Sequence, residues 1–143
     1  MAFQLQPNAL KGWRVVVIDD EPDSLEVVKF LLQRYGAEVH TATDGQSGLA
    51  LINDVRPMFV VSDLAMPKIT GEELVRRVKD DRVLSHIPMI ALSAHAKKED
   101  YARAISAGFH AYMVKPLRPE TFVKDLIRLM LDIPHIASAL EKE

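Results

Sequence analysis

The stretch Val60-Val61-Ser62-Asp63-Leu64-Ala65-Met66-Pro67 decides how the rest of the chain is interpreted. It continues an apolar run of β-forming residues that begins at Met58, directly after Pro57. An apolar run this short, bounded by prolines, predicts a strand that is buried on both faces. Asp63 therefore falls where the strand ends, at the edge of the sheet where open α/β folds carry their chemistry.

Three other short apolar runs end in polar residues in the same way. Residues 15–18 lead into Asp19 and Asp20, residues 89–92 lead into Ser93, and residues 111–114 lead into Lys115 and Pro116. The carboxyl ends of parallel strands meet at one edge of a sheet. The sequence therefore predicts one site that contains carboxylates, a hydroxyl group and a lysine.

Helical patterns separate these strands. Apolar residues recur at helical spacing from Pro22 to Gly36, after an Asp44 cap, after a Thr70–Glu73 capping box, over residues 97–107 and from Pro119 onwards. Residues 38–42 alternate as a further strand, and the last helix is expected to turn Phe122, Leu126 and Leu129 inward. Strands and helices alternate five times. This predicts an α/β fold, (βα)5, with a doubly wound parallel sheet covered on both faces.

The composition describes one globular domain: 143 residues, 48% hydrophobic and 27% charged. We expect an N-terminal arm over 1–13, the domain over 14–132 and a tail over 133–143 that is either a helical extension or the start of a linker. The arm could pack across the base of the sheet through Phe3, Leu5, Leu10 and Trp13, or it could be loose.

Charge and cysteine content exclude several classes of function. The net charge of -2 and the lack of a basic cluster argue against direct nucleic-acid binding, and the absence of cysteine excludes disulfides and thiolate metal sites. The sequence has no signal-peptide pattern and no apolar run that could span a bilayer. We expect no membrane insertion and a cytoplasmic location.

The predicted site is suited to phosphoryl chemistry. A lone aspartate after a strand is usually a helix cap, but three converging carboxylates repel one another unless a cation lies between them. Mg²⁺ binds such oxygen ligands without an all-protein cage. Lys115 and Ser93 would add a positive charge and a hydrogen-bond donor. Together they indicate phosphoryl transfer onto a carboxylate, here Asp63.

The same residues, taken in order, show a family resemblance. The chain from about Trp13 to Asp132 resembles a response-regulator receiver domain of two-component phosphorelay signalling, with CheY-like (flavodoxin-like) topology. The matching positions are Asp19-Asp20, Asp63, Met66-Pro67 with Gly71, Ser93-Ala94, and Tyr112 with Lys115-Pro116. The resemblance implies a five-stranded sheet of order 2-1-3-4-5 and a cis Lys115-Pro116 bond.

The resemblance also implies a role for each site residue. Asp63 would accept a phosphoryl group from a histidine kinase, a histidine phosphotransfer protein or a small acyl phosphate. Mg²⁺, for which Mn²⁺ could substitute, would be held by Asp20, Asp63 and the backbone carbonyl of Ala65, with Asp19 acting through water. Lys115 would pair with the phosphoryl group.

The remaining family positions concern switching. Ser93 would hydrogen-bond the phosphoryl group, and Tyr112 would follow it inward and change the face made by the fourth helix, fifth strand and fifth helix. Tyr112 could instead be only a half-buried strand aromatic. Ala65 and His95 stand at positions that are often polar in the family and that flank the path of the hydrolytic water. The output partner is not indicated, and a homodimer is left open.

There are three alternatives to the interpretation as a phosphorylated signalling receiver. An aspartyl-phosphate hydrolase would carry a second aspartate two residues after the nucleophile, where this chain has Ala65, so we expect a phosphoacceptor and not an enzyme. A nucleotide or flavin binder would need a glycine-rich loop after the first strand, where this chain has Asp19-Asp20-Glu21-Pro22. A degenerate receiver that binds partners without phosphorylation is the third.

Overall fold

One parallel sheet forms the centre of the molecule. The computed structural model describes residues 4–94 and 97–141. The strands are β1 (Arg14–Ile18), β2 (Glu38–Ala42), β3 (Phe59–Ser62), β4 (Met89–Ser93) and β5 (Ala111–Val114). They pair in parallel in the order β2-β1-β3-β4-β5. The predicted fold class and strand order are confirmed.

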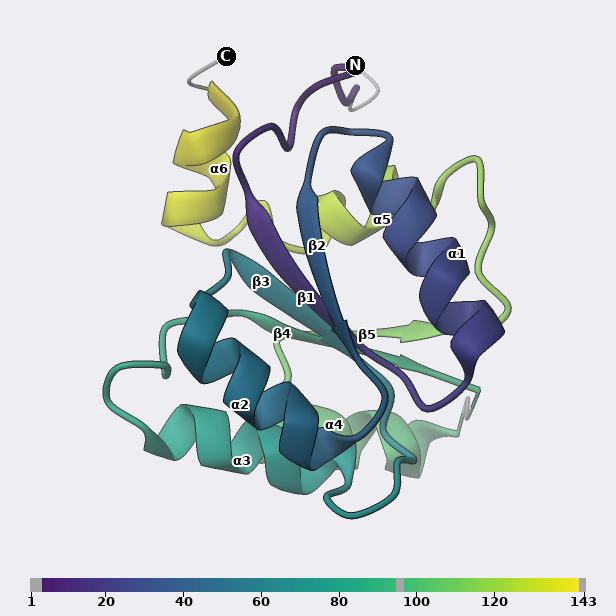
Figure 1. Cartoon of the computed structure of the whole chain (residues 1–143), viewed down its shortest axis with the longest axis vertical. Helices are drawn as coiled ribbons and strands as arrows, with labels where there is room; N and C mark the ends of the chain where they lie inside the picture. The colour runs from purple at the N-terminus through teal and green to yellow at the C-terminus, as the bar shows by residue number, and fades with distance from the viewer. Residues whose placement is uncertain (1–3, 95–96, 142–143) are drawn as a thin grey trace.

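Helices cover both faces of this sheet (Figure 1). They are α1 (Pro22–Gln33), α2 (Gly45–Val55), α3 (Gly71–Asp80), α4 (Lys98–Ala107), α5 (Phe122–Arg128) and α6 (Pro134–Glu141). One apolar cluster joins the sheet to α1 and α5, and the other joins it to α2, α3 and α4. Alternate residues of β1 enter opposite clusters, Val15 and Val17 the first and Val16 and Ile18 the second. This alternation is why the strand is apolar throughout.

Local signals fix where two helices begin. The Asp44 carboxylate accepts a hydrogen bond of 2.8 Å from the Ser47 N–H at the start of α2. The Thr70 hydroxyl accepts one of 3.2 Å from the Glu73 N–H at the start of α3. Each cap satisfies a backbone donor that has no partner inside its helix. Both helix starts were predicted from these residues.

The last predicted helix is shorter than expected. It begins at Phe122 and not at Pro119, and it ends at Arg128, after which the Met130 N–H donates to the Ile127 carbonyl three residues back. These tighter turns rotate the chain relative to an α-helix, so that Met130 is fully buried. Leu129 is 39% exposed, and its predicted inward position was wrong.

Both ends of the described chain pack at the edge of the sheet where the strands begin (Figure 1). In the arm, Leu10 is fully buried, and the Trp13 ring meets Phe59 edge to face at 6.3 Å between centroids. In α6, Ile136 is fully buried in the same cluster. Phe3 lies outside the described residues. The arm is therefore packed from Leu5 onwards, while the domain boundaries themselves stay predictions.

None of the described helices is long and apolar enough to cross a bilayer.

Candidate functional site

The ends of β1 and β3 bring three aspartates together. One carboxylate oxygen from each of Asp19, Asp20 and Asp63 lies within 4.8 Å of the others. Asp19 and Asp63 are 3% and 8% exposed, so two of these charges are largely removed from water. β1 and β3 are adjacent in the sheet, and this adjacency makes residues 44 positions apart neighbours. The carboxyl edge of the sheet therefore carries a concentrated negative charge.

Lys115, which follows β5, reaches across the sheet edge to this cluster. Its Nζ donates to Asp19 Oδ2 at 2.9 Å and to Asp63 Oδ2 at 3.4 Å, and it lies 3.5 Å from Glu21 Oε1. Burial alone would lower the pKa of the Lys115 ammonium, but the hydrogen bond and the charges of the two aspartates outweigh it and raise the pKa. Lys115 is therefore held in its charged form. The Lys115-Pro116 bond is cis, as predicted.

Opposing electrostatic effects act on the Asp63 carboxyl group. Its Oδ1 accepts hydrogen bonds from the Leu64 N–H at 2.7 Å and the Ala65 N–H at 3.3 Å. Burial raises the pKa of the Asp63 carboxyl, and the charge of Asp19 adds to this, while Lys115 and the two N–H groups oppose it. The net direction is upward. This pocket therefore favours a proton, a cation or another means of neutralising the Asp63 charge.

The two aspartates after β1 have different environments. Asp19 is buried, and its Oδ1 accepts a 3.0 Å hydrogen bond from the Glu21 N–H while its Oδ2 accepts from Lys115. Asp20 is exposed. Asp19 directly follows β1, whereas Asp20 lies in the bend after it. Asp19 is thus engaged by the protein, whereas Asp20 faces the solvent side of the cluster.

This donor set fits a hard divalent cation. All three side chains offer carboxylate oxygens, which Mg²⁺ and Mn²⁺ prefer over the nitrogen or sulfur ligands of softer metals. Two of the carboxylates are buried with a single lysine between them. A bound cation would offset the negative charge that the single lysine does not neutralise. The site can therefore hold a metal ion at its open side, where Asp20 and Ala65 are exposed.

Ser93 lies at the end of β4 and is fully buried. Its backbone carbonyl accepts a 2.8 Å hydrogen bond from the Lys115 N–H, which ties the end of β4 to the residue that carries the site lysine. Ser62, at the end of β3, is also buried, and its hydroxyl donates to the Asp63 carbonyl at 2.9 Å. This second serine was not predicted as a site residue, although it stands directly before Asp63.

Tyr112 does not belong to the acidic cluster. It lies three residues before Lys115 in β5, is half-buried, and meets the ring of Tyr101 from α4 at 5.9 Å between centroids. The two rings line a surface hollow of about 450 Å³ together with Lys97, Lys98 and Val114. Tyr101 was not singled out from the sequence. The contact joins β5 to α4 and so lies on the face where a switch was expected. His95 lies outside the described residues.

Gly71 closes the loop that carries Asp63. Its N–H donates to the Leu64 carbonyl at 2.9 Å. A Cβ atom at this position would lie 2.4 Å from the Asp63 carbonyl oxygen and 2.8 Å from the Leu64 Cα, which is closer than real contacts allow. Only glycine therefore permits this approach of α3 to the end of β3. The sequence marked Gly71 as a family position but did not reveal this packing role.

Glu21 is a further residue that the sequence argument left out of the site. Its N–H donates to Asp19 and its carboxylate lies 3.5 Å from the Lys115 Nζ. The only signal in the sequence was its place in the acidic run after β1.

A parallel five-stranded sheet of this order, with carboxylates and a lysine at its carboxyl edge, defines a flavodoxin-like α/β domain with an acidic pocket at that edge. The sequence model of the response regulator receiver domain matches residues 15–127, and the chain belongs to that family.

Similar proteins come from bacterial signalling. The chain is 31% identical to the chemotaxis protein CheY-3 of Vibrio cholerae over 120 residues, which is 83% of this chain and 92% of CheY-3. It is 30% identical over 112 residues to the polar-differentiation response regulator DivK of Brucella anthropi, covering 78% and 91% of the two chains. The structure of the Vibrio cholerae chemotaxis response regulator CheY4 aligns with a TM-score of 0.77 at 32% identity, covering 82% of this chain and 98% of CheY4.

Family membership sets the general kind of function. Response-regulator receiver domains are signalling domains of two-component systems, which interact with kinases and output partners and are not classical enzymes.

Proposed function

We propose that this chain is a phosphorylation-dependent receiver that accepts a phosphoryl group on Asp63 from a histidine kinase or a histidine phosphotransfer protein. One observation carries the proposal. The Lys115 Nζ contacts both Asp19 and Asp63, while the three carboxylates gather within 4.8 Å. A buried carboxylate beside a charged lysine, at the open edge of a parallel sheet, is placed to receive an anionic group. Such a receiver would act in the cytoplasm, where kinase domains have access to ATP.

The transfer is a substitution at phosphorus. A carboxylate oxygen of Asp63 attacks the phosphorus of a phosphohistidine, the P–O bond forms, and the P–N bond breaks. The electron pair returns to the imidazole nitrogen of the donor, which takes up a proton. The ammonium of Lys115, already 3.4 Å from Asp63 Oδ2, offsets the charge that arrives with the phosphoryl oxygens. The backbone N–H groups of Leu64 and Ala65 hold the Asp63 carboxylate in one orientation.

Mg²⁺ is the cofactor that this donor set favours, and Mn²⁺ could substitute. Asp20, Asp63 and the backbone carbonyl of Ala65 would hold the ion, and Asp19 would act through water. The engagement of Asp19 by Glu21 and Lys115 supports that indirect role. When bound, the ion supplies positive charge that neutralises the reacting oxygens.

The proposed output is a changed binding surface. The Ser93 hydroxyl would hydrogen-bond the phosphoryl group, and Tyr112 would move inward after it. The contact between Tyr112 and Tyr101 supports this, because any movement of the Tyr112 ring changes what α4 packs against. The altered surface would be the α4-β5-α5 face, recognised by an output partner that the chain does not name. A homodimer formed through that face is one form that the output could take.

Labelling with a small phosphodonor tests the proposal. The protein is incubated with acetyl phosphate and Mg²⁺, and the phosphorylated fraction and its position are measured by mass spectrometry. We expect one phosphoryl group on Asp63, and none in the Asp63→Asn variant. Asp54→Asn, an exposed aspartate of α2, is the matched control and should label normally. Undiminished labelling of Asp63→Asn would contradict the proposal.

A further inference from the structure

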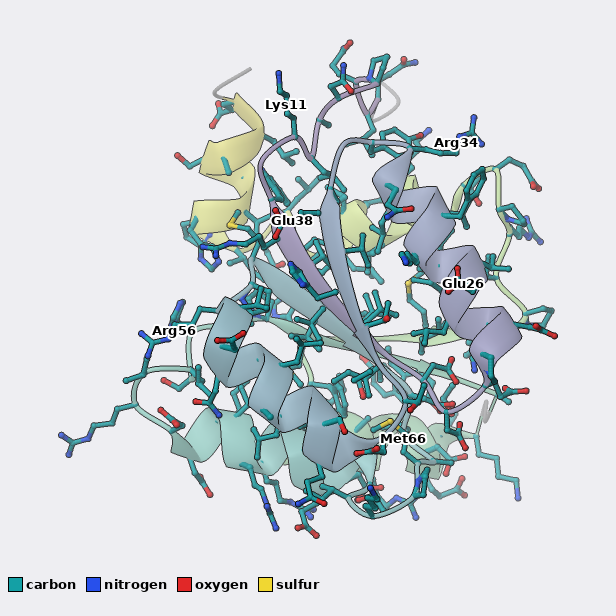
Figure 2. The ribbon with its side chains drawn as sticks, in the orientation of Figure 1. Lys11, Glu26, Arg34, Glu38, Arg56 and Met66 are labelled. Atoms are coloured by element: carbon teal, nitrogen blue, oxygen red, sulfur yellow. The ribbon has the colours of Figure 1, made fainter. Side chains whose placement is uncertain are left out.

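A second hollow lies at the other end of the molecule from the acidic cluster. It has a volume of about 240 Å³, and its lining residues are Gly12, Arg14, Arg56, Pro57, Met58, His86 and His135. In Figure 2, Arg56 and Met66 lie at opposite ends of α2, and Met66 belongs to the loop that follows Asp63. The hollow is therefore separate from the proposed phosphorylation site.

The lining of this hollow is basic. Arg14 from β1, Arg56 after α2, His86 before β4 and His135 in α6 all face it, and no carboxylate is among the lining residues. Within the described ranges 4–94 and 97–141, neither arginine forms an ion pair within 4.0 Å. Four segments distant in the sequence thus bring basic side chains together, in a chain whose net charge is -2.

Two carboxylates on adjoining segments contact histidines that do not line the hollow. Glu38, which is opposite Arg14 in the sheet register, bonds His40 at 2.6 Å. Asp132, just before α6, bonds His110 at 2.9 Å. Each of these acids contacts a histidine outside the hollow, and neither forms an ion pair within 4.0 Å with Arg14 or Arg56.

The two histidines of the hollow are close enough to influence each other. Their rings are 6.4 Å apart between centroids and inclined at 65°. Burial lowers the pKa of His135, and the charge of His86 lowers it further. An anion between the rings and the arginines would reverse this, because a nearby negative charge favours the protonated imidazole.

The backbone holds the basic groups in place. The Arg14 carbonyl accepts a 2.8 Å hydrogen bond from the Met58 N–H, so that the start of β1 and the approach to β3 are joined. Arg56 adopts a left-handed conformation with φ of 50° at the end of α2. Ile136, next to His135, is fully buried and anchors α6 to the core. The hollow is thus formed by elements that the fold itself positions.

We propose that this hollow is a binding site for a phosphate-type oxyanion, either free phosphate or a small phosphate monoester. Guanidinium groups present planar sets of N–H donors that match the oxygens of phosphate, and protonated imidazoles add charged donors. The volume holds one phosphate-sized group with some water, since a water molecule occupies about 30 Å³ in the liquid. Occupancy would tie the start of α6 to the residues where β1 begins and to the segment before β3.

The test is an NMR titration of the intact chain with inorganic phosphate in EDTA, with ionic strength held constant by sodium chloride. We expect saturable shifts of the Gly12 and Met58 amides. Arg14→Gln and Arg56→Asn should each weaken binding about tenfold or more, because each removes a charged hydrogen-bond donor. Asparagine tolerates the left-handed backbone at position 56. Arg77→Gln, on α3, is the control and should bind as the wild type does.

A second measurement needs no variant. The ring pKa of His135 should rise in sulfate, whose charge is constant over the range in which histidine titrates. An unchanged His135 pKa, an equal shift in chloride alone, or wild-type binding by both arginine variants would each overturn the proposal. Titration with glycerol phosphate distinguishes the two sources: tighter binding than inorganic phosphate assigns a monoester, and equal or weaker binding assigns free phosphate.

Discussion

Replacing Gly71 by alanine tests the packing that holds the Asp63 loop. The added Cβ would lie 2.4 Å from the Asp63 carbonyl oxygen and 2.8 Å from the Leu64 Cα, both of them backbone atoms. A carbon and an oxygen approach comfortably only to about 3.3 Å, so either α3 or the Asp63 loop must move by about 0.9 Å. Because the clash is with backbone, no rotation of a side chain can relieve it.

The energetic cost follows from this overlap. Overpacking a tight contact typically costs about 1–3 kcal/mol, and the better helix propensity of alanine returns at most about 1 kcal/mol. We expect the free energy of unfolding to fall by about 1–2 kcal/mol, and the Tm by roughly 3–8 °C for a domain of this size. Misplacement of a reacting group by about 1 Å can cost up to about 100-fold in rate, so acetyl phosphate labelling should slow by about 10- to 100-fold.

Gly48→Ala is the matched control for this experiment. It also introduces a Cβ into a helix, but the nearest atoms, at 2.5 and 3.0 Å, are Cδ1 and Cγ1 of the Ile18 side chain and not backbone atoms. Urea unfolding gives the change in free energy, and the initial labelling rate with acetyl phosphate and Mg²⁺ gives the effect on the site. We expect Gly48→Ala to label at nearly the wild-type rate.

The free energy of unfolding reports on packing, and the labelling rate reports on the site, so the two effects are measured separately. If Gly71→Ala is as stable as the wild type and labels as fast, the backbone contact does not constrain the loop and the reasoning is refuted. If stability falls while labelling is unchanged, the contact is structural only.

Two further predictions concern the acidic cluster. The raised pKa of Asp63 means that the folded state holds its proton to higher pH than the unfolded chain, so its contribution to stability is lost as pH rises above the ordinary range of an aspartate. At pH 7 in EDTA, Asp63→Asn should therefore unfold at a higher urea concentration than the wild type. Its free energy of unfolding should also change less with pH. Equal urea midpoints for the two proteins would contradict this prediction. Asp20→Ala should abolish Mn²⁺ binding measured by paramagnetic relaxation, whereas Asp19→Ala should only weaken it. A larger loss of Mn²⁺ binding in Asp19→Ala than in Asp20→Ala would exclude the assigned ligands.

The order of elements could be predicted from the sequence because it depends on local patterns. Three of the strands, β1, β3 and β4, are short apolar runs, as strands buried on both faces must be. Asp44 and Thr70 mark helix starts because a cap needs only a residue and the backbone three positions later. The polar residues after the strands indicated one site, because parallel strands end at the same edge.

The sequence could not predict features that depend on how distant segments dock. Leu129 fits the helical spacing of α5, yet it lies outside because the helix ends at Arg128. Asp19 and Asp20 are chemically identical, and only the fold buries one against Lys115 and exposes the other. The basic hollow joins residues from β1, the segment after α2, α6 and the chain before β4. Local periodicity fixes which face of an element is apolar, but burial and charge pairing are set by contacts between residues far apart in the chain.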